Sequence, residues 1–314
     1  MDRSQADRPP PEAGPPHPFH TRTYLRGLDN IGETVADGRG RFHLLRRPIP
    51  GSELFDGAGP WPYYRVSGDE DLHTLREGFA DLVTITVVTQ PGYVPPADQV
   101  DSIFLKDHFA YDPRLPRTVL SARTAKRLQA GLAISRFEVA DDRPATTRMA
   151  AEMTPLYRRQ AARRGFSEFF RSFSDTHFTS IADLDAGRYF KVTIDGETGA
   201  MACGILHQGV LQILHIAISD IGLQHNASYV LMSGLLEQAD EAQAKLLTGG
   251  MPDSARDTLE TFKRRWANSY EPVYLLRIVN DRRKYEELSA NRNPKGFFPA
   301  YRQAIASDGR SERT

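Results

Sequence analysis

The second half of the chain alternates helical and strand patterns in an order that restricts the fold more than any other feature of the sequence. Apolar residues recur at helical spacing, and the short turns DGETG and QG separate three strand-like runs. The pattern predicts a helix, three strands, a helix, a strand, a helix and a strand, at 146–164, 188–194, 201–207, 210–218, from a cap at Asn226 onward, 245–248, 254–266 and 272–278. This order is typical of a mixed α/β layer architecture around an antiparallel meander.

The first half is predicted to supply further strands, at 41–45, 63–66 and 82–89. The last of these is a β-branched run that suits a strand buried on both faces. Between the first two lies 51–62, a loop rich in glycine, proline and aromatic residues. It is either a packed surface loop or part of a binding surface that includes Trp61. Ser121 is expected to cap a helix over 121–133.

The length of 314 residues predicts two compact units, at about 150 residues per domain. The first 18 residues hold six prolines and almost no aliphatic side chain, so we expect a disordered tail there. The polar residues 307–314 are expected to be a second disordered tail. The sequence therefore predicts an N-terminal lobe at 19–145 and a C-terminal lobe at 146–306.

Composition excludes several classes of function. The chain has 40 Lys and Arg against 40 Asp and Glu, so a globally basic, DNA-coating protein is disfavoured. No apolar run approaches the roughly 20 residues of a membrane span, and no secretory segment is evident at the start. The single cysteine, Cys203, excludes an intrachain disulfide and a multi-cysteine zinc site, and no metal site is evident. The expected location is the cytoplasm.

Two groups of cationic side chains are candidates for a functional site. Lys263 falls on the apolar stripe of the helix at 254–266, beside Phe262 and Trp266, where a lysine is unexpected. Its ammonium either reaches water at the helix edge or has a function. Arg158 and Arg163 belong to an arginine cluster at 158–164, which either binds phosphate or carboxylate or is a solvated helix end.

Three stretches resemble a known family. RYFKVTIDGETGAMACGIL resembles the central hairpin of the GNAT acyltransferase fold. LLTGG with the later TLETFKRRW is similar to the C-terminal half of Fem-type peptidyltransferases and the related BioF2-like acetyltransferase-domain proteins. RRQAARRGF is similar to the segment that opens the second lobe of these proteins. The resemblance implies two packed GNAT-like lobes, with mixed sheets flanked by helices and a cleft between them, which we expect parts of 51–62 to line.

The resemblance also implies roles for the candidate residues. It makes Lys263 the catalytic residue, as the cation that stabilises negative charge on the carbonyl oxygen during acyl transfer. It makes Arg163 a phosphate ligand for the acceptor, and Phe262, Arg158 and Trp61 join it as candidate substrate-binding residues. The implied activity is N-acyl transfer to an amine with formation of an amide bond.

The acyl donor stays open between a charged tRNA and acyl-CoA. GNAT enzymes that use acetyl-CoA hold its pyrophosphate with a Gln/Arg-x-x-Gly-x-Gly/Ala loop, and the expected place here reads SDIGLQHNASY. The missing loop favours aminoacyl-tRNA, but the chain has no heptad stretch for the coiled-coil arm that long family members often carry. We therefore expect a small-molecule amine acceptor and no tightly bound cofactor. The alternatives are an acetyltransferase with a non-standard CoA site and a non-catalytic binding protein.

The remaining chemistry-bearing residues are expected to be structural. His207 and His215 lie on predicted strands, and Asp107 with His108 forms a polar pair that has no third partner or nucleophile motif. Cys203 has no base near it in the sequence and is expected to be an inert, buried thiol.

Overall fold

The computed structural model describes residues 16–40, 42–66, 68–250, 257–290, 292 and 297–303. The expectation of disordered tails falls largely on residues 1–15 and 307–314, which lie outside the described residues. Of the expected first tail, residues 16–18 are described, and Pro18 is part of an ordered turn. Pro18–His20 forms a short 3-10 turn in which Phe19 is completely buried. An aromatic residue directly after the proline-rich stretch anchors this segment to the core.

The strands of the described part form one eleven-stranded sheet in the order β1-β2-β3-β4-β11-β5-β10-β9-β8-β7-β6. The pairs β3–β4 and β9–β10 are parallel, and the other pairs are antiparallel. The bounds are β1 (Glu33–Ala36), β2 (His43–Pro48), β3 (Phe55–Ala58), β4 (Thr84–Val88), β5 (Ser102–Tyr111), β6 (Ser135–Val139), β7 (Gly187–Ile194), β8 (Glu197–His207), β9 (Val210–Ile218), β10 (Lys245–Gly250) and β11 (Ser269–Val279).

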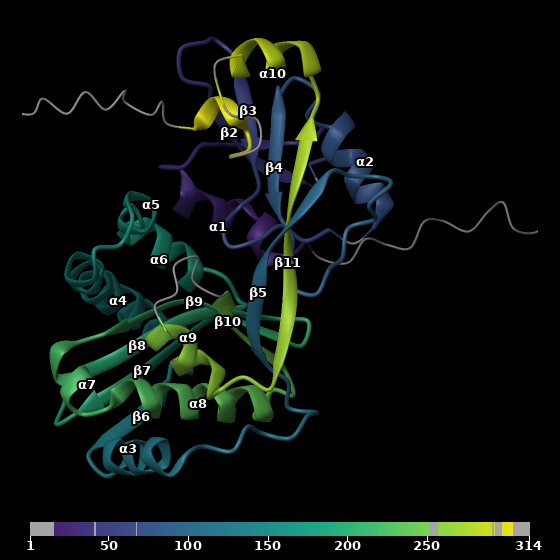
Figure 1. Ribbon diagram of the computed structural model, residues 1–314. Helices are drawn as coiled ribbons and strands as arrows, with labels where there is room; N and C mark the ends of the chain where they lie inside the picture. The colour runs from purple at the N-terminus through teal and green to yellow at the C-terminus, as the bar shows by residue number, and fades with distance from the viewer. Residues whose placement is uncertain are drawn as a thin grey trace, which may run out of the picture.

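Helices flank this sheet, so the predicted mixed α/β class is confirmed (Figure 1). The 3-10 turns are Pro18–His20, Arg26–Leu28 and Ala300–Arg302. The α-helices are α1 (Arg22–Leu25), α2 (Asp69–Glu77), α3 (Ala122–Leu132), α4 (Arg143–Arg164), α5 (Glu168–Arg171), α6 (Asp175–Ala182), α7 (Asp220–Gln224), α8 (Ala227–Glu241), α9 (Asp257–Arg264) and α10 (Arg282–Ser289).

The two halves of the chain interlock through β5 and β11. β11 comes from the second half but lies between β4 and β5, and β5 comes from the first half but pairs with β10. Figure 1 shows these two strands running side by side from one half of the molecule into the other. The strands predicted at 188–194, 201–207, 210–218, 245–248 and 272–278 are therefore all in one sheet, as expected.

The boundary predicted at 145–146 stays a prediction, and strand pairing does not follow it. β6 and α3 precede it in the chain but pack against β7 and α8 of the second half. The turn Ala300–Arg302 follows it but contacts the first half, where the carboxylate of Asp56 on β3 is fully buried between the guanidinium groups of Arg47 and Arg302. Each half thus contains elements from the other half of the sequence.

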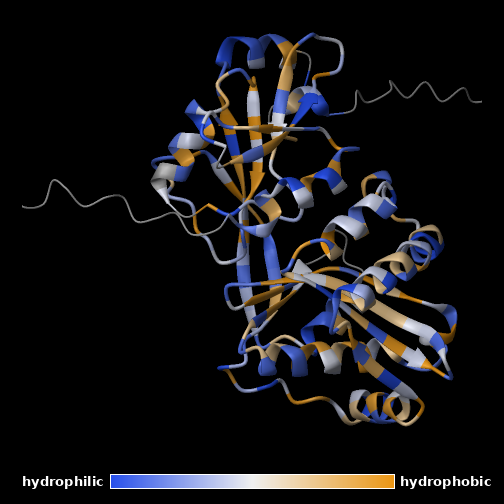
Figure 2. Cartoon of the chain, turned by 180° about the vertical axis from the view of Figure 1, so that it is seen from behind, coloured by the Kyte–Doolittle hydropathy of each residue, from blue (hydrophilic) through white to orange (hydrophobic). Residues whose placement is uncertain are grey.

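Two hydrophobic layers cover the faces of β7, β8 and β9. On one face α4 and α6 bury Met153, Tyr157 and Phe178 against β8. On the other face α8 buries Leu231 and Leu235, and α9 adds its aromatic residues. Figure 2 shows the corresponding concentration of apolar residues along the strands. The burial of these layers is what holds the helices in place around the sheet.

β9 and β10 run together for only a short distance. Their pairing covers Val210–Gln212 and Lys245–Leu247. Beyond it β9 continues along β8 to Ile218, whereas β10 continues along β5 to Gly250. Past Gln212 the facing edges of the two strands are therefore available to groups from elsewhere in the molecule.

Several local predictions are wrong. Residues 63–66 form no strand beyond a single bridge from Tyr64 to Thr89, and the expected loop at 51–62 contains β3. Asn226 stands before α8 in the left-handed conformation, and its side chain makes no cap hydrogen bond. α4 is one helix from the Asp142 cap to Gly165 and contains Pro155. Ser121 does cap α3, as predicted.

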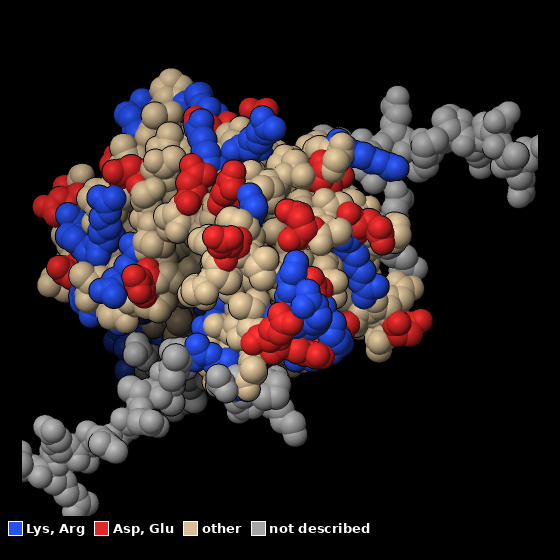
Figure 3. All heavy atoms as spheres, turned by 90° about the horizontal axis from the view of Figure 1, so that it is seen from above, with Lys and Arg blue, Asp and Glu red and all other residues tan. Residues whose placement is uncertain are grey.

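Charges of both signs are interspersed on the face shown in Figure 3. α10 illustrates the pattern, since Arg282 and Arg283 each lie opposite a glutamate one turn later. Such i, i+4 pairs are typical of a solvated helix face. This face therefore offers no extended patch of a single sign.

Candidate active site

α9 is anchored to α8 by aromatic packing. Phe262 and Trp266 stand one turn apart and both contact Tyr229 of α8, with ring centroids 5.4 and 6.3 Å away. Trp266 is almost completely buried. This stripe fixes the rotation of α9 about its axis, so the direction of Lys263, which follows Phe262, is fixed as well.

The ammonium of Lys263 lies at the end of β10. Its Nζ donates a hydrogen bond to the carbonyl oxygen of Gly250 at 3.0 Å and lies 5.9 Å from the ring centroid of Phe109 on β5. The side chain is part-buried, and this burial, followed by the charge of Lys106, lowers its pKa from 10.5 to about 8. Lys263 is therefore not a solvated residue at the edge of the helix.

β5 brings two further groups to the same place. Lys106 and His108 are separated by one residue of β5. Because side chains alternate along a strand, the two lie on the same face. Burial, then Lys263, then Lys106 lower the pKa of His108 to about 3, so its imidazole is neutral. Its Nδ1 is buried without a hydrogen-bond partner among the described residues. His108 was expected to have only a structural role, and no pattern in the sequence marks Lys106.

Two glycines at the end of β10 make room for the lysines. Gly249 has φ +89°, and a Cβ placed there would lie 3.2 Å from Lys263 Nζ. A Cβ on Gly250 would lie only 2.5 Å from Cδ of Lys106. The close approach of both side chains to the strand thus depends on the Gly-Gly pair.

The two lysines differ from three others in the protein. Lys191, Lys245 and Lys284 each form an ion pair with a carboxylate. Neither Lys106 nor Lys263 forms such a pair with any residue that the structure describes. Two unneutralised cations beside a strand end can stabilise negative charge that develops on a ligand, more strongly than they would in water.

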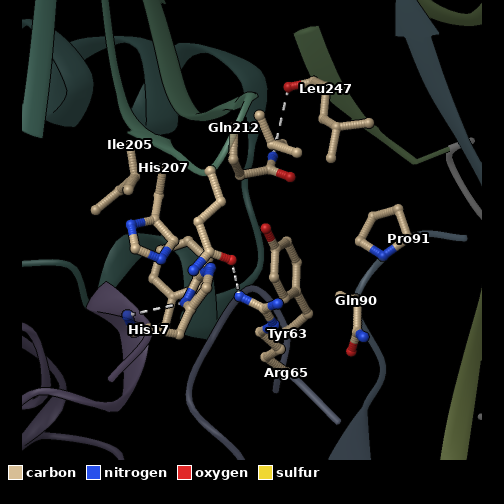
Figure 4. A pocket seen from close by; sticks show the side chains of 12 residues that line it. His17, Tyr63, Arg65, Gln90, Pro91, Ile205, His207, Gln212 and Leu247 are labelled. Atoms are coloured by element: carbon tan, nitrogen blue, oxygen red, sulfur yellow. Dashed lines mark hydrogen bonds between the residues drawn. The ribbon is translucent and has the colours of Figure 1, made fainter. Parts of the chain in front are cut away.

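A pocket lies between the two halves of the molecule, next to the start of β10 (Figure 4). It is a hollow of about 220 Å³. The first half contributes Tyr63, Arg65 and the N-terminal His17, and the β8–β9 hairpin contributes His207 and Gln212. A cleft between lobes was expected, but no residue of 51–62 lines this pocket. The lining residue nearest to that loop in the sequence is Tyr63.

The pocket and the lysine site adjoin the same short strand. Leu247 of β10 lines the pocket, and Gly250, which accepts the hydrogen bond of Lys263, is three residues further on. Three residues of extended strand span about 10 Å. The two sites are therefore neighbours along β10, but the lining of the pocket includes neither Lys106 nor Lys263.

Arg163 and Arg158 lie on α4, which packs on the opposite face of the sheet from α9. Arg163 pairs with Asp220 and donates a hydrogen bond to the carbonyl of Ile218 at 2.9 Å. Arg158 is exposed and lies 3.6 Å from Asp175 of α6. The structure brings Phe262 together with Lys263, but it does not bring either arginine to them.

Trp61 occupies the core between the halves. Its ring lies 5.0 Å from that of Phe173 and 4.8 Å from that of His215, and its carbonyl accepts a hydrogen bond from Tyr24 at 2.6 Å. His215 in turn lies with Nε2 2.9 Å from Nε2 of His177, and burial keeps the pKa of both imidazoles low. These contacts are structural ones.

Cys203 and His207 contrast with each other. Cys203 is completely buried, and this burial raises its pKa to about 12, so it is an inert thiol as expected. His207 lines the pocket, and its Nε2 has no partner among the described residues. The purely structural role expected for His207 thus omits its place at the pocket.

A side chain from α4 occupies the edge of β9 past the point where β10 leaves it. Gln160 is almost fully buried; its Nε2 donates to the carbonyl of Ile216 at 2.7 Å, and its Oε1 accepts from the N–H of Ile218 at 2.8 Å. A neighbouring strand would make the same two hydrogen bonds. An extended ligand therefore finds these backbone groups already paired.

Residues 121–264 match the family model described as the acetyltransferase (GNAT) domain. The chain carries a GNAT acyltransferase domain. The predicted resemblance to GNAT acyltransferases is confirmed by this match, and similar solved structures, FemX among them, share the fold. None of the curated proteins matches the sequence.

The structural matches extend over most of the chain. FemX is 12% identical, with a TM-score of 0.61 over 86% of this chain and 94% of FemX. L-PGS from Bacillus licheniformis is 13% identical, with a TM-score of 0.56 over 80% of this chain and 84% of that one. The C-terminal domain of a putative lysylphosphatidylglycerol synthetase from Agrobacterium fabrum is 15% identical, with a TM-score of 0.55 and coverage of 80% and 85%. At these identities the comparison shows a shared fold.

Two features are absent from the part of the chain that the structure describes. No helix in it is long and apolar enough to cross a bilayer. No three histidine, cysteine, aspartate or glutamate side chains in it gather as metal ligands would.

Proposed function

We propose that the protein is an N-acyltransferase that joins an activated acyl or aminoacyl group to an amine acceptor. The observation that carries the proposal is the ammonium of Lys263, which is part-buried and has no carboxylate partner among the described residues. It is held at the end of β10, the strand whose Leu247 also lines the pocket between the halves. A cation in such a place is suited to an oxyanion that forms during acyl transfer. Lys106 adds a second positive charge to the same site.

The proposed reaction needs no covalent enzyme intermediate. The nitrogen of the acceptor attacks the acyl carbon, the carbonyl electrons move to oxygen, and the resulting negative charge lies beside Lys263. The intermediate collapses to an amide and expels the donor's alcohol or thiol, while the attacking nitrogen loses a proton. That proton leaves to solvent or to the departing oxygen or sulfur of the donor, because His108, with its pKa lowered to about 3, is too weak a base to accept it. Positioning of the two substrates supplies the rest of the rate.

Aminoacyl-tRNA is the donor that we favour. The chain lacks the pyrophosphate-binding loop, and Gln160 and Arg163 already occupy backbone groups at the edge of β9, where an extended arm of a donor could otherwise pair. One of the similar structures is named as a putative lysylphosphatidylglycerol synthetase, and this name denotes a product that bears a lysyl group. Another is named L-PGS. The donor in this chain is an inference from these observations together.

An acyl-CoA donor is the second candidate, because the matching family model is that of acetyltransferases. A CoA site here would rely on side chains in place of the missing loop. A non-catalytic binding protein is the third candidate. A fully solvated Lys263 without a neighbouring pocket would have favoured that reading, and the part-buried lysine argues against it.

The test is acyl transfer measured by mass spectrometry. The purified chain is incubated in parallel with a mixture of charged tRNAs or with acetyl-CoA, and with a panel of amines in both cases. Amide formed only from charged tRNA supports the favoured donor, and amide formed only from acetyl-CoA assigns the chain to the second candidate. No amide from either donor across the panel would favour the non-catalytic protein.

A further inference from the structure

The pocket between the halves contains a buried polar group whose partner is missing. Gln212 is 3% exposed, and its Nε2 donates to the carbonyl of Ile213 at 2.7 Å and, more weakly, to that of Leu247 at 3.5 Å. These carbonyls fix the orientation of the amide, because the reversed amide would place oxygen against oxygen. Its Oε1 is then left without a hydrogen-bond partner in the described part of the chain. An unpaired buried acceptor is costly unless a ligand supplies the donor.

A second glutamine in the lining of the same pocket has no unpaired amide oxygen. Gln90 accepts a hydrogen bond from the N–H of Val66 at 2.9 Å and donates one to the carbonyl of Val66 at 2.6 Å. Both ends of that amide are therefore used within the protein. Figure 4 shows the hydroxyl of Tyr63 directed toward the amide of Gln212, so polar groups of both halves converge there.

The charge of the pocket is a single positive one. Arg65 lies in the lining, and its guanidinium donates a hydrogen bond to the side chain of Gln208. Burial lowers the pKa of His17 to about 2 and also lowers that of His207, so both imidazoles are neutral. The lining contains no carboxylate among the residues described. One guanidinium without an acidic partner suits a ligand with one negative charge.

We propose that this pocket selects the acceptor as a free amino acid, whose carboxylate binds Arg65 and whose N–H group donates to Gln212. The proposal rests on the proposed function, since it names the substrate class of the same site. The hollow of about 220 Å³ suits a molecule of this size better than a polymer. A singly charged carboxylate also matches the lone cation better than a phosphate dianion does. The pairing of Arg65 with Gln208 keeps the guanidinium in place until the ligand arrives.

The proposal is tested by binding in the absence of any acyl donor. Isothermal titration calorimetry of the full chain is carried out with the common amino acids, with their carboxamides, with the matching decarboxylated amines and with inorganic phosphate. We expect at least one amino acid to bind with a stoichiometry of one. Its carboxamide and its decarboxylated amine should bind at least tenfold more weakly.

Three variants sharpen the test. Arg65→Gln should weaken binding of that amino acid at least tenfold, whereas Arg283→Gln, on the exposed face of α10, should not change it. Gln208→Asn should bind at least as tightly as the parent, because the shorter side chain no longer competes for Arg65 and asparagine tolerates the φ of +47° at this position. If the Arg65–Gln208 contact is merely structural, Arg65→Gln and Gln208→Asn should weaken amino-acid binding to the same extent.

Several outcomes would overturn the proposal. They are equal binding of the amino acid and its carboxamide, tighter Arg65-dependent binding of phosphate, and no binding by any amino acid to a chain whose thermal unfolding is intact. Failure of the proposed function is distinguishable from these outcomes. Lys263→Met should retain amino-acid binding whether or not it loses acyl transfer.

Discussion

Replacing Lys263 by methionine tests the candidate active site most directly, because methionine keeps most of the apolar stem and removes the cation. If the ammonium stabilises an oxyanion, we expect the rate of acyl transfer to fall by about 100-fold to 1000-fold. A loss of that size corresponds to about 3–4 kcal/mol in the barrier. Uniform loss of substrate binding would instead raise KM and leave kcat nearly unchanged.

The same change should alter stability far less. Folding lowers the pKa of Lys263 from 10.5 to about 8, and at 1.36 kcal/mol per pKa unit the charged lysine costs at most about 3 kcal/mol, less because the side chain is not fully buried. Methionine removes that cost. It also leaves the carbonyl of Gly250 unpaired, which costs about 1–3 kcal/mol. The two effects oppose each other, so the free energy of unfolding should change by less than about 2 kcal/mol.

The pH dependence of the parent has a definite sign. Below about pH 8 the lysine is charged in the folded and the unfolded chain, and its burial penalty is fully present. As the pH rises from about 8 toward 10.5 the folded chain loses the proton first, so the parent gains stability in this window and Lys263→Met does not. The rate moves the other way, because deprotonation removes the catalytic cation. Lys263→Arg should have a lower rate that does not fall above pH 8.

The assay is the initial rate of amide formation by mass spectrometry, with chemical denaturation of the same samples as a check on folding. Arg264→Met is the matched control, since Arg264 is the next residue of α9, exposed and paired with Glu260. It should react like the parent. If Lys263→Met turns over within about threefold of an active parent, the lysine has no part in the chemistry.

Three further predictions concern the elements around the site. Gln160→Leu should lower the free energy of unfolding by about 2–4 kcal/mol in urea titrations, because it leaves two buried backbone groups of β9 unpaired, and a loss below about 0.5 kcal/mol would contradict this account. Asp56→Ala should lower it by about 3–5 kcal/mol, because two guanidinium groups lose their shared carboxylate, and a variant as stable as the parent would count against the ion pairs. Gly250→Ala should displace Lys106 and reduce the rate at least tenfold while amino-acid binding at Arg65 persists, and an unchanged rate would exclude a role for the close packing.

The sequence predicts α3, α4, α8, α9 and the strands β7 to β11, because each of these elements carries its own pattern. α3 has a hydroxyl cap, α4 ends at a left-handed glycine, and the strands of the meander alternate between turn signals. Local chemistry of this kind is legible without knowledge of the partners. Lys263 is predicted equally well, because its place on the apolar stripe follows from the residues next to it in the helix.

β5 shows why the rest could not be predicted. Its first residues, Ile103 to Leu105, are exposed, its middle holds Lys106 and His108, and only its end is buried, so no regular alternation marks it as a strand. What makes it a strand is its position between β10 and β11, two partners that come more than a hundred residues later. Sequence reasoning therefore missed Lys106 as well.

The pocket was missed for a related reason. Arg65 stands in a segment without regular secondary structure, whereas Gln212 lies on β9, and only the packing of the two halves brings them to one cavity. No spacing in the sequence connects them. The unpaired oxygen of Gln212 is likewise visible only when its surroundings are known.

The interlocked order of β4, β11 and β5 governs how the chain can fold during synthesis. β4 and β5 leave the ribosome early, and about half of the chain must follow before β11 arrives to pair with both of them. Until then β4 and the first part of β5 expose strand edges that can pair with other chains. The matched domain at 121–264 ends just before β11, so a fragment cut at its boundaries would lack the strand that joins the halves. Expression at high concentration should therefore depend on chaperones that shield these edges until the last strand inserts.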